Sequence, residues 1–299
     1  MEEPETFHDT GPTAEEESSP LLLERLHRTL ARWNERRLRA EQPTRRWRDE
    51  IEDDLRMRSL EGEWIEAECA ALAPWTRGLP RTAPAFLRWF EALRMDGEED
   101  GEPMPGGRPS LDEVRWCMRQ ELAAGAGLDA LVALLRIRLP NLPRVSHPIA
   151  GRDRLLRLAR RVDVESDGLR AVWESLAVAN LDVGFALSRR YGWHALGALG
   201  AVVMTGANRT ERVARALRQL GIDVEEADLP REHAHAAGWL SAVLVPGVAE
   251  DLDRITWLAE GALLRLRAGV RCDHRYRSEL GLSGDAPRAS GPATPRLSS

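Results

Sequence analysis

The chain has 299 residues, 43% of them hydrophobic, which suffices for the core of one large domain or two small ones. Its 42 basic residues are all arginine, against 48 acidic residues, for a formal net charge of −6. The arginines alternate with acidic residues, as on solvated helix faces, and no basic stripe is interleaved with aromatic residues. The composition therefore argues against a nucleic-acid-binding protein.

The compartment is indicated by the cysteines and by the apolar segments. Cys69, Cys117 and Cys272 lie far apart without a C-x-x-C pair, which argues against a disulfide framework or a zinc motif and favours a reducing compartment. The acidic N-terminus lacks the features of a signal peptide. The longest apolar run, residues 195–207, is too short to span a bilayer. We expect a cytoplasmic protein that does not insert into a membrane.

The N-terminal third is predicted to be helical after a disordered start. Residues 1–20 are acidic, with proline, serine and threonine, and are expected to be disordered. Apolar residues at i+3 and i+4 spacing then predict three helices, over residues 21–41, 48–72 and 82–93. Residues 94–110, rich in glycine, proline and acidic residues, form either a surface loop or a domain linker.

The remaining chain continues as helices. They are predicted over residues 110–139, 152–162, 170–191, 192–220, 230–246 and 249–280. Ser110 and Glu113 form a capping box, and "TGAN" at 205–208 marks a possible interruption. The tail after Gly281 is expected to be disordered. Since no segment shows sustained period-two alternation, we predict an all-α antiparallel bundle.

The strongest candidate for chemistry is the set Asp228, Glu232 and His235. Their i, i+4, i+7 spacing places them on one face of a continuous helix. Carboxylate and imidazole ligands suit a non-haem iron inside a helical bundle. Pro230 favours a second interpretation, because proline normally occupies the first turn of a helix. Asp228 would then lie outside the helix and help to cap it.

Four other polar residues are weaker candidates. Tyr191 and His194, in "SRRYGWH", are interpreted as packing at a corner between helices, with a metal-independent catalytic role as the alternative. Glu121 and Asp129 are two turns apart and could converge on a site.

Two polar residues fall on the otherwise apolar helix 170–191. Asn180 shares a face with apolar residues and is predicted to be buried with a backbone partner. Asp182 lies on a different face, where it is either an ion-pair partner or solvated.

Three segments carry a family resemblance. "EVRWCMRQELAAGAGLDALVALLRIRLP", "VWESLAVANLDVGFALSRRYGWHALGALGAVVMTGANR" and "EGALLRLRAGVRCDHRYR" resemble the bacterial iron-containing redox enzymes of the haem-oxygenase-like superfamily. The similarity runs from about Leu60 to Glu279. It implies a haem-oxygenase-like bundle of about seven helices. It also implies a non-haem iron or diiron site built from a glutamate, a histidine, a second glutamate and an H-x3-D-x2-H set.

Most of these ligand positions are changed in this chain. The resemblance places the second glutamate on Val203 and the H-x3-D-x2-H set on Asp228, Glu232 and His235, with Trp239 matching the tryptophan that follows. The segment for the first glutamate and histidine, between "RLP" and "LLRLARR", is shortened, and its His147 is out of register. Metal affinity depends on the number of ligands and on their support, so the stretch is interpreted as a relic or weak site.

Composition, periodicity and the resemblance together predict four parts: a disordered acidic N-terminus (1–20), a helical extension (21–59), the haem-oxygenase-like bundle (60–280) and a disordered tail (281–299). We expect a degenerate, non-catalytic member without a bound cofactor. It would bind a protein partner, such as a second copy or an active relative, or a small apolar ligand. The alternative is an iron-dependent oxidase with a rebuilt, carboxylate-rich site that adds Glu121 or Asp129 to the three residues.

Overall fold

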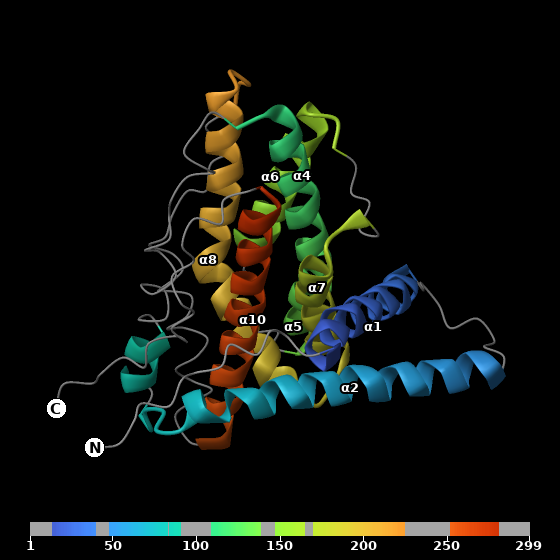
Figure 1. Cartoon of the computed structure of the whole chain (residues 1–299). Coiled ribbons are helices and arrows are strands. Elements are labelled where there is room, and N and C mark those ends of the chain that lie inside the picture. Colours follow the sequence, from blue (N-terminus) through green and yellow to red (C-terminus); the bar gives the residue numbers. More distant parts are fainter. Residues whose placement is uncertain are drawn as a thin grey trace, which may run out of the picture.

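The computed structural model describes residues 14–39, 48–82, 84–90, 109–138, 147–164, 170–224 and 252–280. Every regular element within these ranges is a helix, which confirms the all-α class (Figure 1). The elements are α1 (Ala14–Arg39), α2 (Arg48–Thr76), α4 (Leu111–Ala124), the 3-10 turn η1 (Gly125–Gly127), α5 (Leu128–Arg138), α6 (His147–Arg161), α7 (Trp173–Leu187), α8 (Gly192–Gln219) and α10 (Leu252–Glu279). Residues 84–90 are also helical.

Several helix ends differ from the predictions. α1 begins at Ala14, inside the segment expected to be disordered, and α8 continues without interruption through residues 205–208. The predicted helix over 110–139 is divided by η1, where a Cβ on Gly127 would lie 2.4 Å from the Ala179 carbonyl oxygen. This close approach to α7 requires glycine, a poor helix former. The predicted helix 230–246 and the tail lie outside the described residues.

The start of α4 is capped as its sequence predicts. The Glu113 backbone N–H donates to Ser110 Oγ at 3.2 Å, and the Ser110 backbone N–H donates to a Glu113 carboxylate oxygen at 2.6 Å. Both bonds satisfy N–H groups that have no partner within the helix.

α8 and α10 pack closely and run in the same direction (Figure 1). A Cβ on Gly197 would lie 2.0 Å from the Leu258 carbonyl oxygen, and one on Gly261 would lie 2.0 Å from the His194 carbonyl oxygen. Only glycine allows backbones to approach in this way. These two contacts hold the first turns of α8 against α10.

α1 and α2 pack on the bundle rather than standing apart from it. The Asn180 side chain, buried on α7, donates to the His27 carbonyl oxygen at 2.9 Å and accepts from Asn34 Nδ2 at 3.1 Å. The prediction of a buried Asn180 with a backbone partner is confirmed. α2 crosses the foot of the bundle and runs unbroken past residue 60, so the chain has no break at the predicted division between extension and bundle (Figure 1).

A buried ion pair joins α7 to α10. Arg265 Nε lies 3.1 Å and 3.3 Å from the two carboxylate oxygens of Asp182, whose side chain is fully buried. Of the two interpretations of Asp182, the ion pair is correct. Removing one member of such a pair leaves an uncompensated charge in the core, which costs about 3–5 kcal/mol.

Among the described helices, none combines the length and apolar character that a bilayer crossing requires.

Candidate functional site

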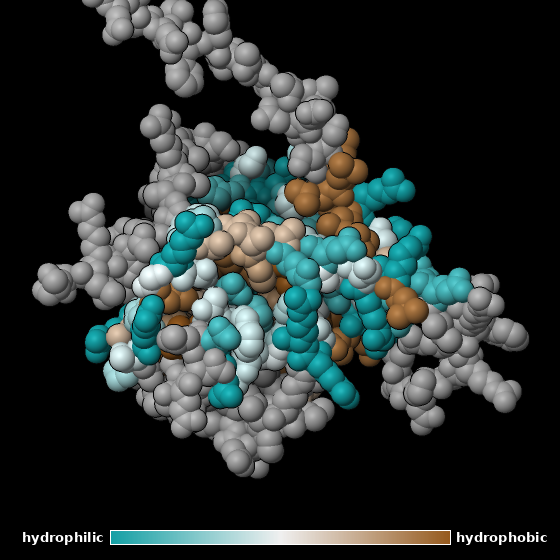
Figure 2. Space-filling model, turned by 90° about the horizontal axis from the view of Figure 1, so that it is seen from below, coloured by the Kyte–Doolittle hydropathy of each residue, from teal (hydrophilic) through white to brown (hydrophobic). Residues whose placement is uncertain are grey.

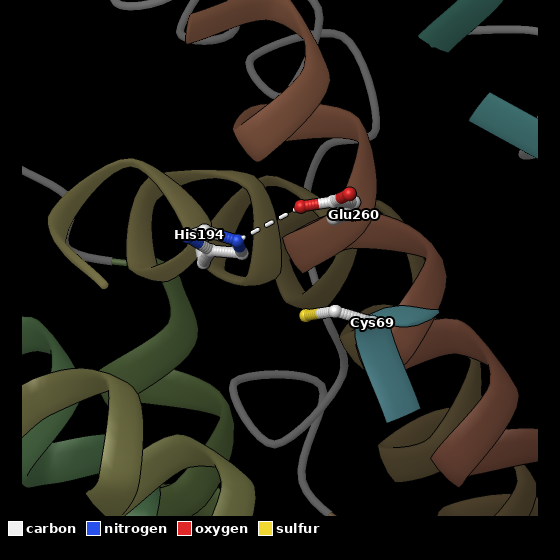
Figure 3. A group of neighbouring side chains, drawn as sticks. All are labelled: Cys69, His194 and Glu260. Atoms are coloured by element: carbon white, nitrogen blue, oxygen red, sulfur yellow. Dashed lines mark hydrogen bonds and ion pairs between the residues drawn. The ribbon is translucent and has the colours of Figure 1, made fainter. Parts of the chain in front are cut away.

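Three helices bring one thiol, one imidazole and one carboxylate together at the foot of the bundle. Cys69 lies on α2, His194 in the first turn of α8 and Glu260 on α10 (Figure 3). The contact between Gly261 and the His194 backbone places the neighbouring Glu260 beside the imidazole. Next to Cys69, Glu68 accepts from Arg271 of α10 at 2.9 Å and 3.3 Å, which holds α2 in place.

The ligand atoms of this Cys69–His194–Glu260 cluster all lie within 4.8 Å of one another. His194 Nε2 is 3.0 Å from Glu260 Oε2 and forms a hydrogen bond with it (Figure 3). The His194 side chain is 7% exposed and that of Glu260 17%, while Cys69 is half-buried. The cluster is therefore largely shielded from water.

Aromatic rings surround the imidazole. Tyr191 packs edge-on against His194, with ring centroids 5.3 Å apart, and Phe185 lies at 5.8 Å. Trp257, which is 40% exposed, is stacked on the imidazole with ring centroids 6.5 Å apart. Within the described part of the chain, His194 Nδ1 and the Tyr191 hydroxyl are buried without a hydrogen-bond partner. Buried polar atoms are normally bonded, so this corner has unused hydrogen-bonding capacity.

The electrostatics of the corner disfavour a free thiolate. Burial, and then the negative charge of the nearby Glu260 carboxylate, raise the pKa of the Cys69 thiol to about 12. Burial also raises the pKa of Tyr191. Without a bound cation, Cys69 is thus a protonated, unreactive thiol at neutral pH.

The three donors differ in chemical type. A thiolate sulfur, an imidazole nitrogen and a carboxylate oxygen are the ligands used by Zn²⁺ and neighbouring transition metals, whereas Mg²⁺ and Ca²⁺ prefer oxygen alone. Without a metal, the same residues form a buried His–Glu hydrogen bond beside an inert thiol.

The sequence analysis found only one member of this cluster. The packing corner predicted around Tyr191 and His194 is confirmed by the ring contacts, and the exposed Arg190 pairs with Glu66. Cys69 and Glu260 were not identified as partners of His194. Each comes from a different helix, so no local spacing links them. The available signals were a carboxylate within the apolar run of α10 and an isolated cysteine.

The predicted metal-ligating residues Asp228, Glu232 and His235 lie outside the described residues, as does Trp239. Whether the helix begins at Pro230 stays a prediction. His147 is the first residue of α6, and its side chain lies outside the described part of the chain.

Glu121 and Asp129 do not belong to the cluster. Glu121 is half-buried on α4, and Asp129 is exposed in the first turn of α5. Among the described residues, the group of three potential metal ligands contains neither of them.

The described residue at an implied iron-ligand position does not suit a metal. Val203, on α8, is half-buried and packs against the apolar core. It lies nine residues after His194 on the same helix, about 14 Å along the axis at 1.5 Å per residue. The Cys69–His194–Glu260 cluster is therefore separate from the position that the resemblance assigns to iron.

Comparison with known proteins gives one match. Residues 152–270 match the sequence model of the family described as iron-containing redox enzymes. The matched segment begins on α6 and ends on α10, so it contains His194, Val203 and Glu260 but not Cys69. Neither a curated protein nor a solved structure matches the chain.

Proposed function

We propose that the protein is a non-catalytic relative of the iron-containing redox enzymes whose family model residues 152–270 match, and that it acts by binding. The observation that carries the proposal is Val203, whose side chain packs against the apolar core where the family places a glutamate ligand. A valine offers no donor atom to a metal. The proposal is supported further by Asp228 and Glu232, which stand where the resemblance expects a histidine and an aspartate.

The helices around Val203 are joined by close packing and by a buried ion pair. α8 and α10 are held together at Gly197 and Gly261, and the buried Asp182–Arg265 pair ties α7 to α10. Such a bundle is stable without a metal, because its helices are joined by packing and ion pairs of their own. A binding protein that derives from an enzyme would keep the helical bundle and lose the metal ligands, as the residues at the implied ligand positions suggest here.

Exposed leucines favour a protein partner as the bound molecule. Leu21 and Leu22 on α1 are 70% and 65% exposed, and Leu55 on α2 is 62% exposed. Figure 2 shows hydrophobic side chains in separate patches among hydrophilic ones on the face seen from below. Scattered exposed leucines are common on soluble proteins, but they supply contact area for a second chain. Alternatively, the protein would bind a small apolar ligand at the position that the resemblance assigns to iron.

Anaerobic loading with ferrous iron tests the proposal. The full chain is loaded, desalted, analysed for iron and then exposed to dioxygen. We expect iron well below one equivalent per chain and no dioxygen consumption, because ligand number determines affinity.

The His235→Ala variant is the matched control. Iron content near one equivalent that falls by at least tenfold in this variant, together with dioxygen consumption, would show a working site of Asp228, Glu232 and His235. The protein would then be an iron-dependent oxidase with a rebuilt site, and the proposal would be wrong.

A further inference from the structure

We propose that Cys69, His194 and Glu260 bind a divalent transition-metal ion of the Zn²⁺ class at the junction of α2, α8 and α10. The inference does not depend on the proposed function, since the cluster is separate from the implied iron position and Cys69 lies outside the matched family segment.

The distances fit a shared metal ion. A tetrahedral zinc ion has bonds of about 2.0 Å to nitrogen or oxygen and about 2.3 Å to sulfur, so its ligand atoms lie roughly 3.3 to 3.6 Å apart. In the cluster, His194 Nε2 and Glu260 Oε2 are 3.0 Å apart, and all three ligand atoms lie within 4.8 Å. For coordination, the most distant pair of these atoms would have to approach by little more than about 1 Å.

The charges also fit. A ligating Cys69 thiolate and the Glu260 carboxylate carry two negative charges, which one divalent cation neutralises. Without a cation, a thiolate beside this carboxylate in a largely buried corner would cost much free energy in desolvation and repulsion, so Cys69 stays protonated and releases its proton only when a metal binds. The neutral imidazole of His194 adds a third ligand without adding charge.

The donor set selects the class of metal. One sulfur and one imidazole nitrogen among three ligands favour Zn²⁺ and neighbouring transition metals over Mg²⁺ and Ca²⁺. Three protein ligands leave one tetrahedral position for water or a small ligand, as in catalytic rather than closed structural zinc sites. The partly exposed ring of Trp257 is stacked on the imidazole ligand.

The position of the ligands explains how such a site would be held. Each comes from a different helix, and the glycine contact between α8 and α10 fixes two of them relative to each other. The site therefore forms only in the folded protein, and metal binding is expected to stabilise the fold.

Zinc and cobalt titrations of the metal-free full chain test the inference. The protein is stripped with a chelator and titrated with Zn²⁺ in competition with a chromogenic chelator, and separately with Co²⁺. We expect one equivalent of Zn²⁺ per chain, a rise in melting temperature, and a thiolate-to-cobalt charge-transfer band in the near ultraviolet. The variants Cys69→Ser and Glu260→Gln should each weaken Zn²⁺ binding by at least tenfold, and Cys69→Ser should remove the band.

The matched control is Cys117→Ser, which replaces another buried cysteine that lies outside the cluster. It should keep both the zinc stoichiometry and the band, and circular dichroism of each variant confirms that it is folded. Absence of Zn²⁺ binding, or binding that Cys69→Ser and Glu260→Gln leave unchanged, would overturn the inference. His235→Ala should leave zinc binding unchanged, so loss of Zn²⁺ binding in that variant alone would also overturn the inference. The proposed function is tested separately, because it would be overturned by stoichiometric iron binding with dioxygen consumption.

Discussion

His27 illustrates how a single buried residue makes the stability depend on pH. It is fully enclosed by α1, α2 and α7, stacked on Trp173 and edge-on to Trp64. Burial, and then the positive charge of Arg271, lower its pKa from 6.5 to about 4. The unfolded chain therefore takes up this proton at a higher pH than the folded chain. The stability due to neutral His27 is complete above pH 6.5 and is lost as the pH falls towards 4.

The variant His27→Phe tests this dependence. Phenylalanine keeps a ring against Trp173 and cannot be protonated. Between pH 7 and pH 5, we expect the wild type to lose about 2 kcal/mol more of its unfolding free energy than the variant does, measured by urea denaturation. Equal losses in both proteins would show that His27 is not the responsible group.

At the scale of the element, the contact between α8 and α10 depends on two glycines. In Gly197→Ala or Gly261→Ala, the new Cβ would meet a backbone carbonyl oxygen that cannot move aside. We expect each variant to lose about 3 kcal/mol of unfolding free energy, because overpacking against backbone outweighs the gain in helix propensity.

Gly62 on α2 provides the control, since nothing lies within 4 Å of its Cβ position. Gly62→Ala should stabilise the protein by up to about 1 kcal/mol through helix propensity alone. If all three variants changed the urea midpoint alike, the close packing of α8 and α10 would not be the cause.

The sequence predicted elements well where the signal was local. The capping box at Ser110 and the buried Asn180 follow from spacing along one helix. The division of the predicted helix 110–139 at η1 could not be predicted from spacing, because it depends on how closely Gly127 approaches α7. The Cys69–His194–Glu260 cluster was missed for the same reason: helix packing, not sequence spacing, brings its members together.

At the scale of the whole molecule, the all-α fold class could be predicted from the sequence, whereas the packing of the helices against one another could be predicted only in part. Helical periodicity and the family resemblance gave the all-α haem-oxygenase-like class, and the match over residues 152–270 agrees. The close contacts that α10 makes with α2 and α8 could not be read from helix periodicity. Within the described chain, α8 carries both Val203, at the implied iron position, and His194 of the three-donor cluster, about 14 Å apart along its axis.

The most direct test of whether zinc binds at the cluster while iron does not bind at the altered site is to measure both metals in one sample. The full-length protein is stripped of metal, loaded anaerobically with both iron and zinc, and analysed for each. We predict about one equivalent of zinc per chain, iron well below one equivalent, and no dioxygen consumption on exposure to air. Stoichiometric iron that supports dioxygen consumption would contradict this prediction.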